Sequence, residues 1–206
     1  MKKTLILMLA AAMLLTSMLT SCTTSGDGGN SAGTSEGETT AAEGNTPVEP
    51  NFEGTLSEIL AQITEKSGNE AINGMEEVLT GDISEFTVGL TADQMTQYVE
   101  EGIIFMPMIN VNAHMVALIK AKDVESAATL KGLLAEQFDN RRWVCVMPEQ
   151  SAVIEAGQYV MLAVSTKDFS NNLLNAFAEI AGPAAGEANI FFEGEGEFIP
   201  EDEILG

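Results

Sequence analysis

Apolar residues recur with a helical period at four places in the chain. In residues 55–68 they fall three and four positions apart, as in an amphipathic helix. Thr55 and Glu58 have the spacing of a capping box, so this helix is expected to begin at Thr55. A second box that opens with Thr91 predicts a short helix that ends at Gly102.

Two longer helices are expected in the second half of the chain. Asp123 is the expected N-cap of the first, and Gly182 is expected to end the second. Each has an apolar stripe that should face the core. The stripes consist of Ala127, Leu130, Leu134 and Phe138 in the first helix, and of Phe169, Leu173, Phe177 and Ile180 in the second.

Alternating apolar residues predict the strands of an antiparallel sheet. Residues 111–120 form the clearest strand, with odd-numbered positions on one face and even-numbered positions on the other. Residues 103–109 contain Pro107, which has no N–H for a ladder, so they predict an edge or bulged strand. Residues 152–155 and 159–165 predict a hairpin whose turn contains a glycine.

Two further stretches carry weaker patterns. Residues 143–147 are apolar and end before Pro148, so they predict a short buried strand. Residues 69–90 are ambiguous. They include a short helix around Met75 as one alternative, and this helix would be broken at Gly81.

Together these elements predict one α+β domain over residues 52–181. Its expected architecture has two layers: an antiparallel sheet of three to five strands, with helices packed mainly on one face. Residues 182–206 form an acidic tail that we expect to be loosely attached or disordered. No internal disulfide is expected, because lipidation of Cys22 leaves Cys145 without a partner.

The start of the chain has the parts of a lipoprotein export signal. Two lysines precede an apolar run at residues 5–15, which is too short to span a bilayer because a spanning helix needs roughly 20 residues. Residues 19–22, Leu-Thr-Ser-Cys, resemble the lipobox of bacterial lipoproteins. The resemblance implies removal of a signal peptide, residues 1–21, and a lipid anchor at Cys22 that holds the chain at the extracytoplasmic face of the cell membrane. At least two acyl chains are implied, since one gives only marginal binding.

Residues 22–51 are expected to be a flexible tether. After Cys22 they consist largely of Gly, Ser, Thr and Glu, with almost no large apolar residue to offset the entropy of the chain. A flexible coil of this length spans roughly 30 Å on average. The tether would therefore lift the domain clear of the lipid surface.

The charge of the chain limits its partners. Loss of Lys2 and Lys3 with the signal peptide leaves seven basic residues against 31 acidic ones, a balance of −24. Nucleic acid is not expected as a partner, because phosphate contacts need clusters of Lys and Arg. The expected partners are the lipid bilayer, through acylated Cys22, and an envelope protein.

Two segments resemble a known family. These are FMPMINVNAHMVALIKAKD (105–123), with the helix after it, and GQYVMLAVS (157–165). They resemble a family of small, uncharacterised lipoproteins of Gram-positive bacteria that is defined only as a domain of unknown function. The resemblance covers roughly residues 55–181 and rests on apolar strands. It implies a compartment and a fold, but no activity and no functional residue beyond the lipidated cysteine.

The sequence contains few candidates for chemistry. Cys145 and His114 are the only thiol and imidazole of the mature domain apart from Cys22. A Cys–His pair is the minimum for thiol catalysis, but Cys145 lies in an apolar run and is expected to be buried and structural. His114 is expected to be a polar strand residue. No catalytic residue, metal-ligand spacing or cofactor motif is predicted.

Arg141, Arg142 and Trp143 interrupt the acidic background. Arg and Trp are enriched at binding hot spots, so these three residues are candidates for contact with a partner. The alternative is that the cations complement the dipole of the preceding helix and that Trp143 belongs to the core. The leading expectation is a non-catalytic interaction or accessory domain at the cell envelope. The alternatives are a small-ligand binding lipoprotein and an enzyme with Cys145 as nucleophile.

Overall fold

The structure is a computed structural model that describes residues 48–108, 113–143 and 145–194. The expected signal peptide, Cys22 and most of the expected tether lie outside these residues. None of the described helices is long and apolar enough to cross a membrane. The elements in chain order are α1 (Leu56–Ser67), β1 (Gly74–Val78), α2 (Gly81–Thr87), α3 (Ala92–Tyr98), β2 (Val99–Pro107), β3 (Met115–Ala121), α4 (Val124–Gln137), β4 (Gln150–Ala156), β5 (Tyr159–Ser165), α5 (Lys167–Ala181), the 3-10 helix η1 (Gly182–Ala184) and β6 (Asn189–Glu193).

The strands form one open antiparallel sheet in the order β1-β2-β3-β5-β4-β6. This confirms the α+β class and the antiparallel sheet, whereas the expected number of three to five strands was too low. β2 was expected at an edge but lies between β1 and β3. Pro107 is tolerated there because it is the last residue of the strand, and a register shift lies at the other end between Val99 and Glu101.

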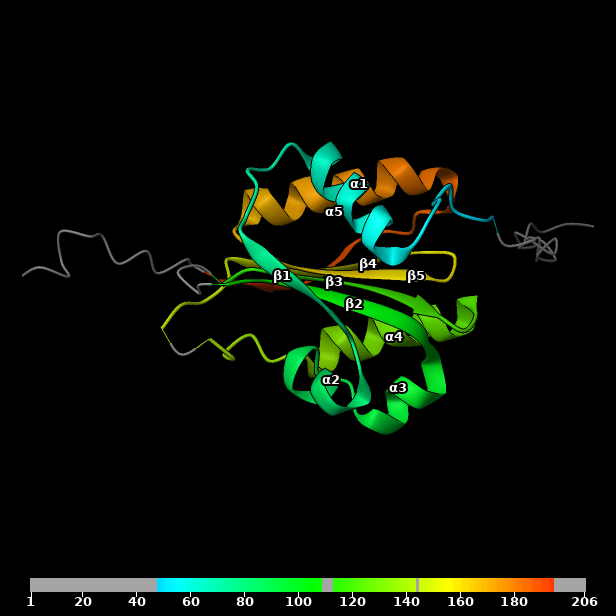
Figure 1. The fold of residues 1–206 in the computed structure, drawn as a ribbon, viewed down its shortest axis with the longest axis horizontal. Helices are drawn as coiled ribbons and strands as arrows, with labels where there is room; N and C mark the ends of the chain where they lie inside the picture. Colours follow the sequence, from blue (N-terminus) through cyan, green and yellow to red (C-terminus); the bar gives the residue numbers. More distant parts are fainter. Residues whose placement is uncertain (1–47, 109–112, 144, 195–206) are drawn as a thin grey trace, which may run out of the picture. The chain divides into compact units, whose positions relative to one another are not determined.

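Helices cover both faces of the sheet, so the expectation of two layers was wrong. Figure 1 shows α1 and α5 on one face and α2, α3 and α4 on the other. Each face has its own cluster of buried apolar side chains. The physical reason lies in the central strands. β3 and β5 are buried at nearly every position, so both of their faces require cover.

The helix ends follow the sequence closely. Thr55 and Thr91 each form a complete capping box, and the carboxylate of Asp123 accepts a hydrogen bond from the backbone N–H of Ser126. α3 ends at Tyr98, earlier than expected, because the chain continues directly into β2. The predicted hairpin is also confirmed, with Gly157 at a φ of 55° in its turn.

The structure decides the ambiguous segment 69–90 and corrects the strand expected at 143–147. The segment around Met75 is strand β1 and not a helix, and Gly81 begins helix α2 instead of breaking one. Of the strand expected at 143–147, the described residues Trp143 and 145–147 do not lie in a strand, and β4 begins only at Gln150. The strand that pairs with β5 is therefore Gln150–Ala156.

The first part of the acidic tail is not loose. β6 pairs with β4, and Phe191 packs with Phe138 at a ring-centroid distance of 6.2 Å. The ammonium group of Lys131 donates a hydrogen bond of 2.7 Å to the carbonyl of Glu187. The carboxylate of Glu193 forms an ion pair of 2.8 Å with Lys167. Apolar packing and these two polar contacts therefore add a sixth strand to the sheet.

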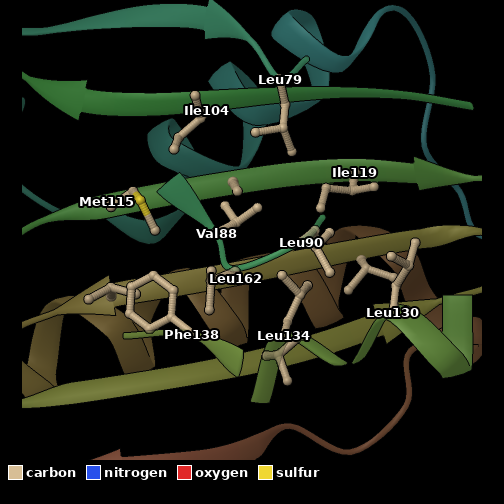
Figure 2. Packing of buried hydrophobic residues seen from close by; sticks show 14 of the residues in the cluster. Leu79, Val88, Leu90, Ile104, Met115, Ile119, Leu130, Leu134, Phe138 and Leu162 are labelled. Atoms are coloured by element: carbon tan, nitrogen blue, oxygen red, sulfur yellow. The ribbon is translucent and has the colours of Figure 1, made fainter. Parts of the chain in front are cut away.

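The face beneath α2, α3 and α4 is densely filled. Figure 2 shows side chains of α4 against those of the central strands. Leu130 and Leu134 are fully buried there. Phe138, at the C-terminal end of α4, packs against Trp143 in the same cluster. Burial of each such side chain contributes about 1.5–3 kcal/mol relative to exposure.

Candidate functional site

A cavity of about 460 Å³ lies between α1, α5 and the β2–β3 part of the sheet. This volume is within the usual range of small-molecule sites. Its walls are largely apolar and are contributed by the two helices, the two strands, residues 69–72 and β1. They include Leu60, Ala61, Phe105, Val116, Phe169 and Leu173.

His114 lies at this cavity and is 97% buried, with a relative exposure of 3%. Its Nδ1 is 3.0 Å from Oγ of Ser165. Phe105 and Phe169 present their rings edge to face with the imidazole, at centroid distances of 6.1 and 4.7 Å. Burial lowers the pKa of His114 to about 4, so the ring is neutral at physiological pH.

The register of the sheet explains the contact between His114 and Ser165. β3 pairs with β5 so that Met115 lies opposite Val164. The next pair outward is His114 opposite Ser165, on the face covered by α1 and α5. A contact between residues 51 positions apart therefore follows from one antiparallel pairing.

A second cavity of about 450 Å³ lies beside the first. His114, Phe169 and the segment 69–72 line both. Ser165 and Asp168 line only the second, which lies at the start of α5. His114 and Phe169 therefore lie where the two spaces meet.

The segment that follows α1 encloses the cavity on one side. Gly68 adopts a φ of 66°, a left-handed conformation that ends α1 and turns the chain away. The side-chain amide of Asn69 then donates to the carbonyl of Phe169 at 3.0 Å and accepts from the amide of Asn172 at 2.9 Å. Ser57 on α1 donates to the carboxylate of Glu76 on β1. These contacts join α1, β1 and α5 around the cavity.

Acidic side chains surround the opening of the cavity. Glu65, Glu70 and Glu76 line it and are exposed, so they lie at its mouth and not on its floor. None of them takes part in an ion pair among the described residues. No Lys or Arg is among the described residues that line the cavity.

The predicted contact residues lie elsewhere and differ from one another in exposure. Trp143 is buried in the core beneath α4, and Arg141 is exposed. Arg142 is half-buried: its guanidinium donates to the carbonyl of Thr87 and lies 5.4 Å from the centre of the ring of Phe86. Only part of this cluster therefore faces solvent, and its role in partner contact stays a prediction.

Cys145 is exposed, which corrects the expectation of a buried thiol. It lies in a bend and not in a strand, so no neighbouring strand covers it. His114 is buried on the α1–α5 face of the sheet. No contact between Cys145 and His114 is present in the described part of the chain. Within that part, no cluster of three or more His, Cys, Asp or Glu has the arrangement of a metal site.

Ser165, Phe169 and Asn69 are site residues that the sequence analysis missed. Each is a common residue type with no motif around it. The one available signal was the pairing of residues 111–120 with residues 159–165, which places His114 near the end of the partner strand. The sequence pattern predicted both strands but not their register.

Comparisons with known proteins give no match: no family model, no curated protein and no solved structure is similar to this chain. The resemblance to small Gram-positive lipoproteins therefore stays a prediction.

Proposed function

We propose that this chain is a lipoprotein anchored through Cys22 at the extracytoplasmic face of the membrane, and that its domain binds a small, largely apolar ligand without transforming it. The observation that carries the proposal is the cavity of about 460 Å³ with the buried His114 in its wall. Well-formed apolar cavities with a few convergent polar groups are typical of ligand sites.

The polar groups at the cavity suit binding better than catalysis. The neutral imidazole of His114 is hydrogen-bonded through Nδ1 to Ser165, which leaves Nε2 without a partner among the described residues. A neutral ring nitrogen can donate to or accept from an uncharged ligand group. A general base at neutral pH would need a pKa near 7, and the pKa of His114 is held far below that by burial.

The ligand site is tested by closing the cavity. Ala61 lines it from the exposed side of α1, so Ala61→Trp adds a large side chain without overpacking the core. Ala128→Trp, at an exposed position of α4, is the matched control. The neutral fluorophore N-phenyl-1-naphthylamine should bind saturably to the wild type and the control, and at least about tenfold more weakly to Ala61→Trp. Equal binding to all three proteins, or none to the wild type, would contradict the proposal.

The anchor is tested separately. A Cys22→Ala variant should retain its signal peptide and incorporate no labelled palmitate, whereas the wild type should be processed and labelled. Palmitate incorporation into the variant would contradict lipidation at this residue.

A second candidate is the interaction domain, and it rests on one exposed aromatic ring. Phe86 on α2 is 77% exposed and lies beneath the guanidinium of Arg142. Aromatic residues and arginine are enriched at protein interfaces. Envelope crosslinking should lose a partner in Phe86→Ala and Arg141→Ala but not in Val124→Ala, which alters an exposed apolar residue of α4. A crosslinking pattern that is identical in all three variants would argue against this candidate.

A further inference from the structure

We infer that the ligand of the cavity is an amphipathic organic cation: an apolar body that lies between α1, α5 and the sheet, with a protonated amine at the mouth beside Glu65, Glu70 and Glu76. This inference rests on the proposed ligand-binding function and names the chemical class of the ligand.

The first argument is the division of the site into an apolar floor and an acidic rim. Phe105, Val116 and Leu173 contribute apolar surface to the walls, and the three carboxylates at the mouth are exposed. A ligand that fills such a site removes apolar area from water and keeps its charged end in contact with the rim. A carboxylate or phosphate ligand would instead place like charges together, which is unfavourable.

The second argument is that the chain supplies no cation for these carboxylates. All basic residues other than Lys2 and Lys3 lie in the described part of the chain. Four of them form ion pairs with other acids: Lys66 with Glu179, Lys120 with Glu100, Lys131 with Glu155, and Lys167 with Glu193.

The remaining three basic residues are also engaged elsewhere or distant in the fold. Lys122 donates to the carbonyl of Thr96, and Arg142 donates to that of Thr87. Arg141 lies in the chain between Phe138 and Trp143, which both pack into the apolar cluster on the opposite face of the sheet. The negative potential at the mouth is therefore not neutralised by these residues, and a cationic ligand would meet it directly.

The third argument is that the imidazole of His114 offers a ligand a polar contact at the inner end of the cavity. His114 is 97% buried and lines both cavities, and its Nε2 has no partner among the described residues. The described buried atoms that lack a partner do not include this Nε2, so it is accessible to a molecule in the cavity and can donate to or accept from it. A ligand that reaches from the acidic mouth to this nitrogen would contact groups at both ends.

The test compares three ligands that share one alkyl chain and differ in their head group. Octylamine, octanol and octanoate are titrated against N-phenyl-1-naphthylamine bound to the whole mature chain, residues 22–206, with Cys22→Ser so that no lipid competes. At neutral pH the amine is protonated and the acid ionised. Octylamine should displace the fluorophore at a concentration at least about tenfold lower than octanoate, with octanol between them. The preference should shrink as salt is added.

Two double variants test whether the carboxylates at the mouth cause the preference for octylamine. Glu65→Gln with Glu70→Gln should weaken octylamine binding by roughly four- to tenfold and leave octanol unchanged, because exposed charge pairs each contribute up to about 1 kcal/mol. Glu85→Gln with Glu136→Gln makes the same change in net charge at exposed positions of α2 and α4. This control should bind octylamine like the wild type.

The outcomes separate this inference from the function on which it rests. Equal displacement by the three ligands, with Ala61→Trp still defective, would overturn the cationic ligand and leave the cavity as a binding site. Equal loss in both double variants would assign the preference to overall charge and would also overturn it. Failure of the fluorophore to bind, or binding that Ala61→Trp does not change, would overturn the proposed function and this inference with it.

Discussion

The two faces of the sheet are built from the same strands but are covered differently. Beneath α2, α3 and α4, the side chains of a long helix pack directly onto the central strands (Figure 2). Beneath α1 and α5, the helices leave a cavity over Phe105, Val116 and His114. Alternate residues of β3 supply both surfaces: Met115, Ala117 and Ile119 belong to the first, and Val116 and Leu118 to the second.

The cavity lies beside the end of α1, since the other helix on this face, α5, has 15 residues and is at least as long as α4. α4 has 14 residues and brings its stripe of leucines across the central strands. α1 has 12 residues and ends at Gly68, after which residues 69–73 pass into β1 without forming a helix. Residues 69–72 of this non-helical segment line the cavity. The end of α1 thus marks where the cavity face differs from the packed face.

The largest expected effect is a loss of stability when a leucine is shortened, and it should differ between the two faces. Leu134→Ala on the packed face removes a fully buried side chain and should lower the free energy of unfolding by about 3–5 kcal/mol, because it creates a new void. Leu60→Ala, at the cavity wall, should cost only about 2 kcal/mol, since part of that side chain already borders empty space. Urea denaturation measures both. Equal losses would mean that the two faces are packed alike.

The next effect is a pH dependence of the free energy of unfolding, caused by His114 on the cavity face. Burial lowers the pKa of His114 to about 4 in the folded protein, against an ordinary value of 6.5. The unfolded chain therefore binds this proton more readily, and stability falls as the pH is lowered from 6.5 towards 4. The loss should be on the order of 3 kcal/mol across this window, because one unit of pKa corresponds to about 1.4 kcal/mol.

His114→Gln isolates this contribution from the titration of the many carboxylates. The variant should have lower stability at neutral pH but a shallower decline between pH 6.5 and 4, measured by urea denaturation at several pH values. Parallel pH profiles for the variant and the wild type would show that His114 is not the group responsible.

A smaller effect compares two adjacent arginines at the edge of the packed face. Arg142→Ala removes a hydrogen bond to the carbonyl of Thr87 and a cation–π contact with Phe86, so it should cost about 1–2 kcal/mol. Arg141→Ala alters an exposed side chain and should change stability by less than about 0.5 kcal/mol. Urea denaturation distinguishes the two. Similar losses would indicate that both arginines support the core.

The sequence predicted the elements that local chemistry specifies. Thr55, Thr91 and Asp123 were identified as helix caps because each places an oxygen where free backbone N–H groups need one. The hairpin around Gly157 followed from the same kind of local rule. Such signals lie within a few residues of one another, so no tertiary information was needed.

The features that depend on pairing between distant segments were missed. The apolar residues on both faces of β3 and β5 indicated cover on two sides, but the expected fold placed helices mainly on one. The contact of His114 with Ser165 depends on a register that alternation alone does not determine. The cavity depends on where α1 ends relative to β2 and β3, which only the packed structure defines.

The smallest expected effect lies just beyond the packed face, at Cys145. Trp143 is buried in the core beneath α4, and Cys145, two residues later, is exposed. Cys145→Ser should therefore change the free energy of unfolding by less than about 0.5 kcal/mol. In the native protein carrying Cys22→Ser, this thiol should react with a disulfide reagent within a few-fold of the rate seen in urea, because Cys145 is exposed. Strong protection of the thiol in the native state would mean that Cys145, like Trp143, is covered by the packed face.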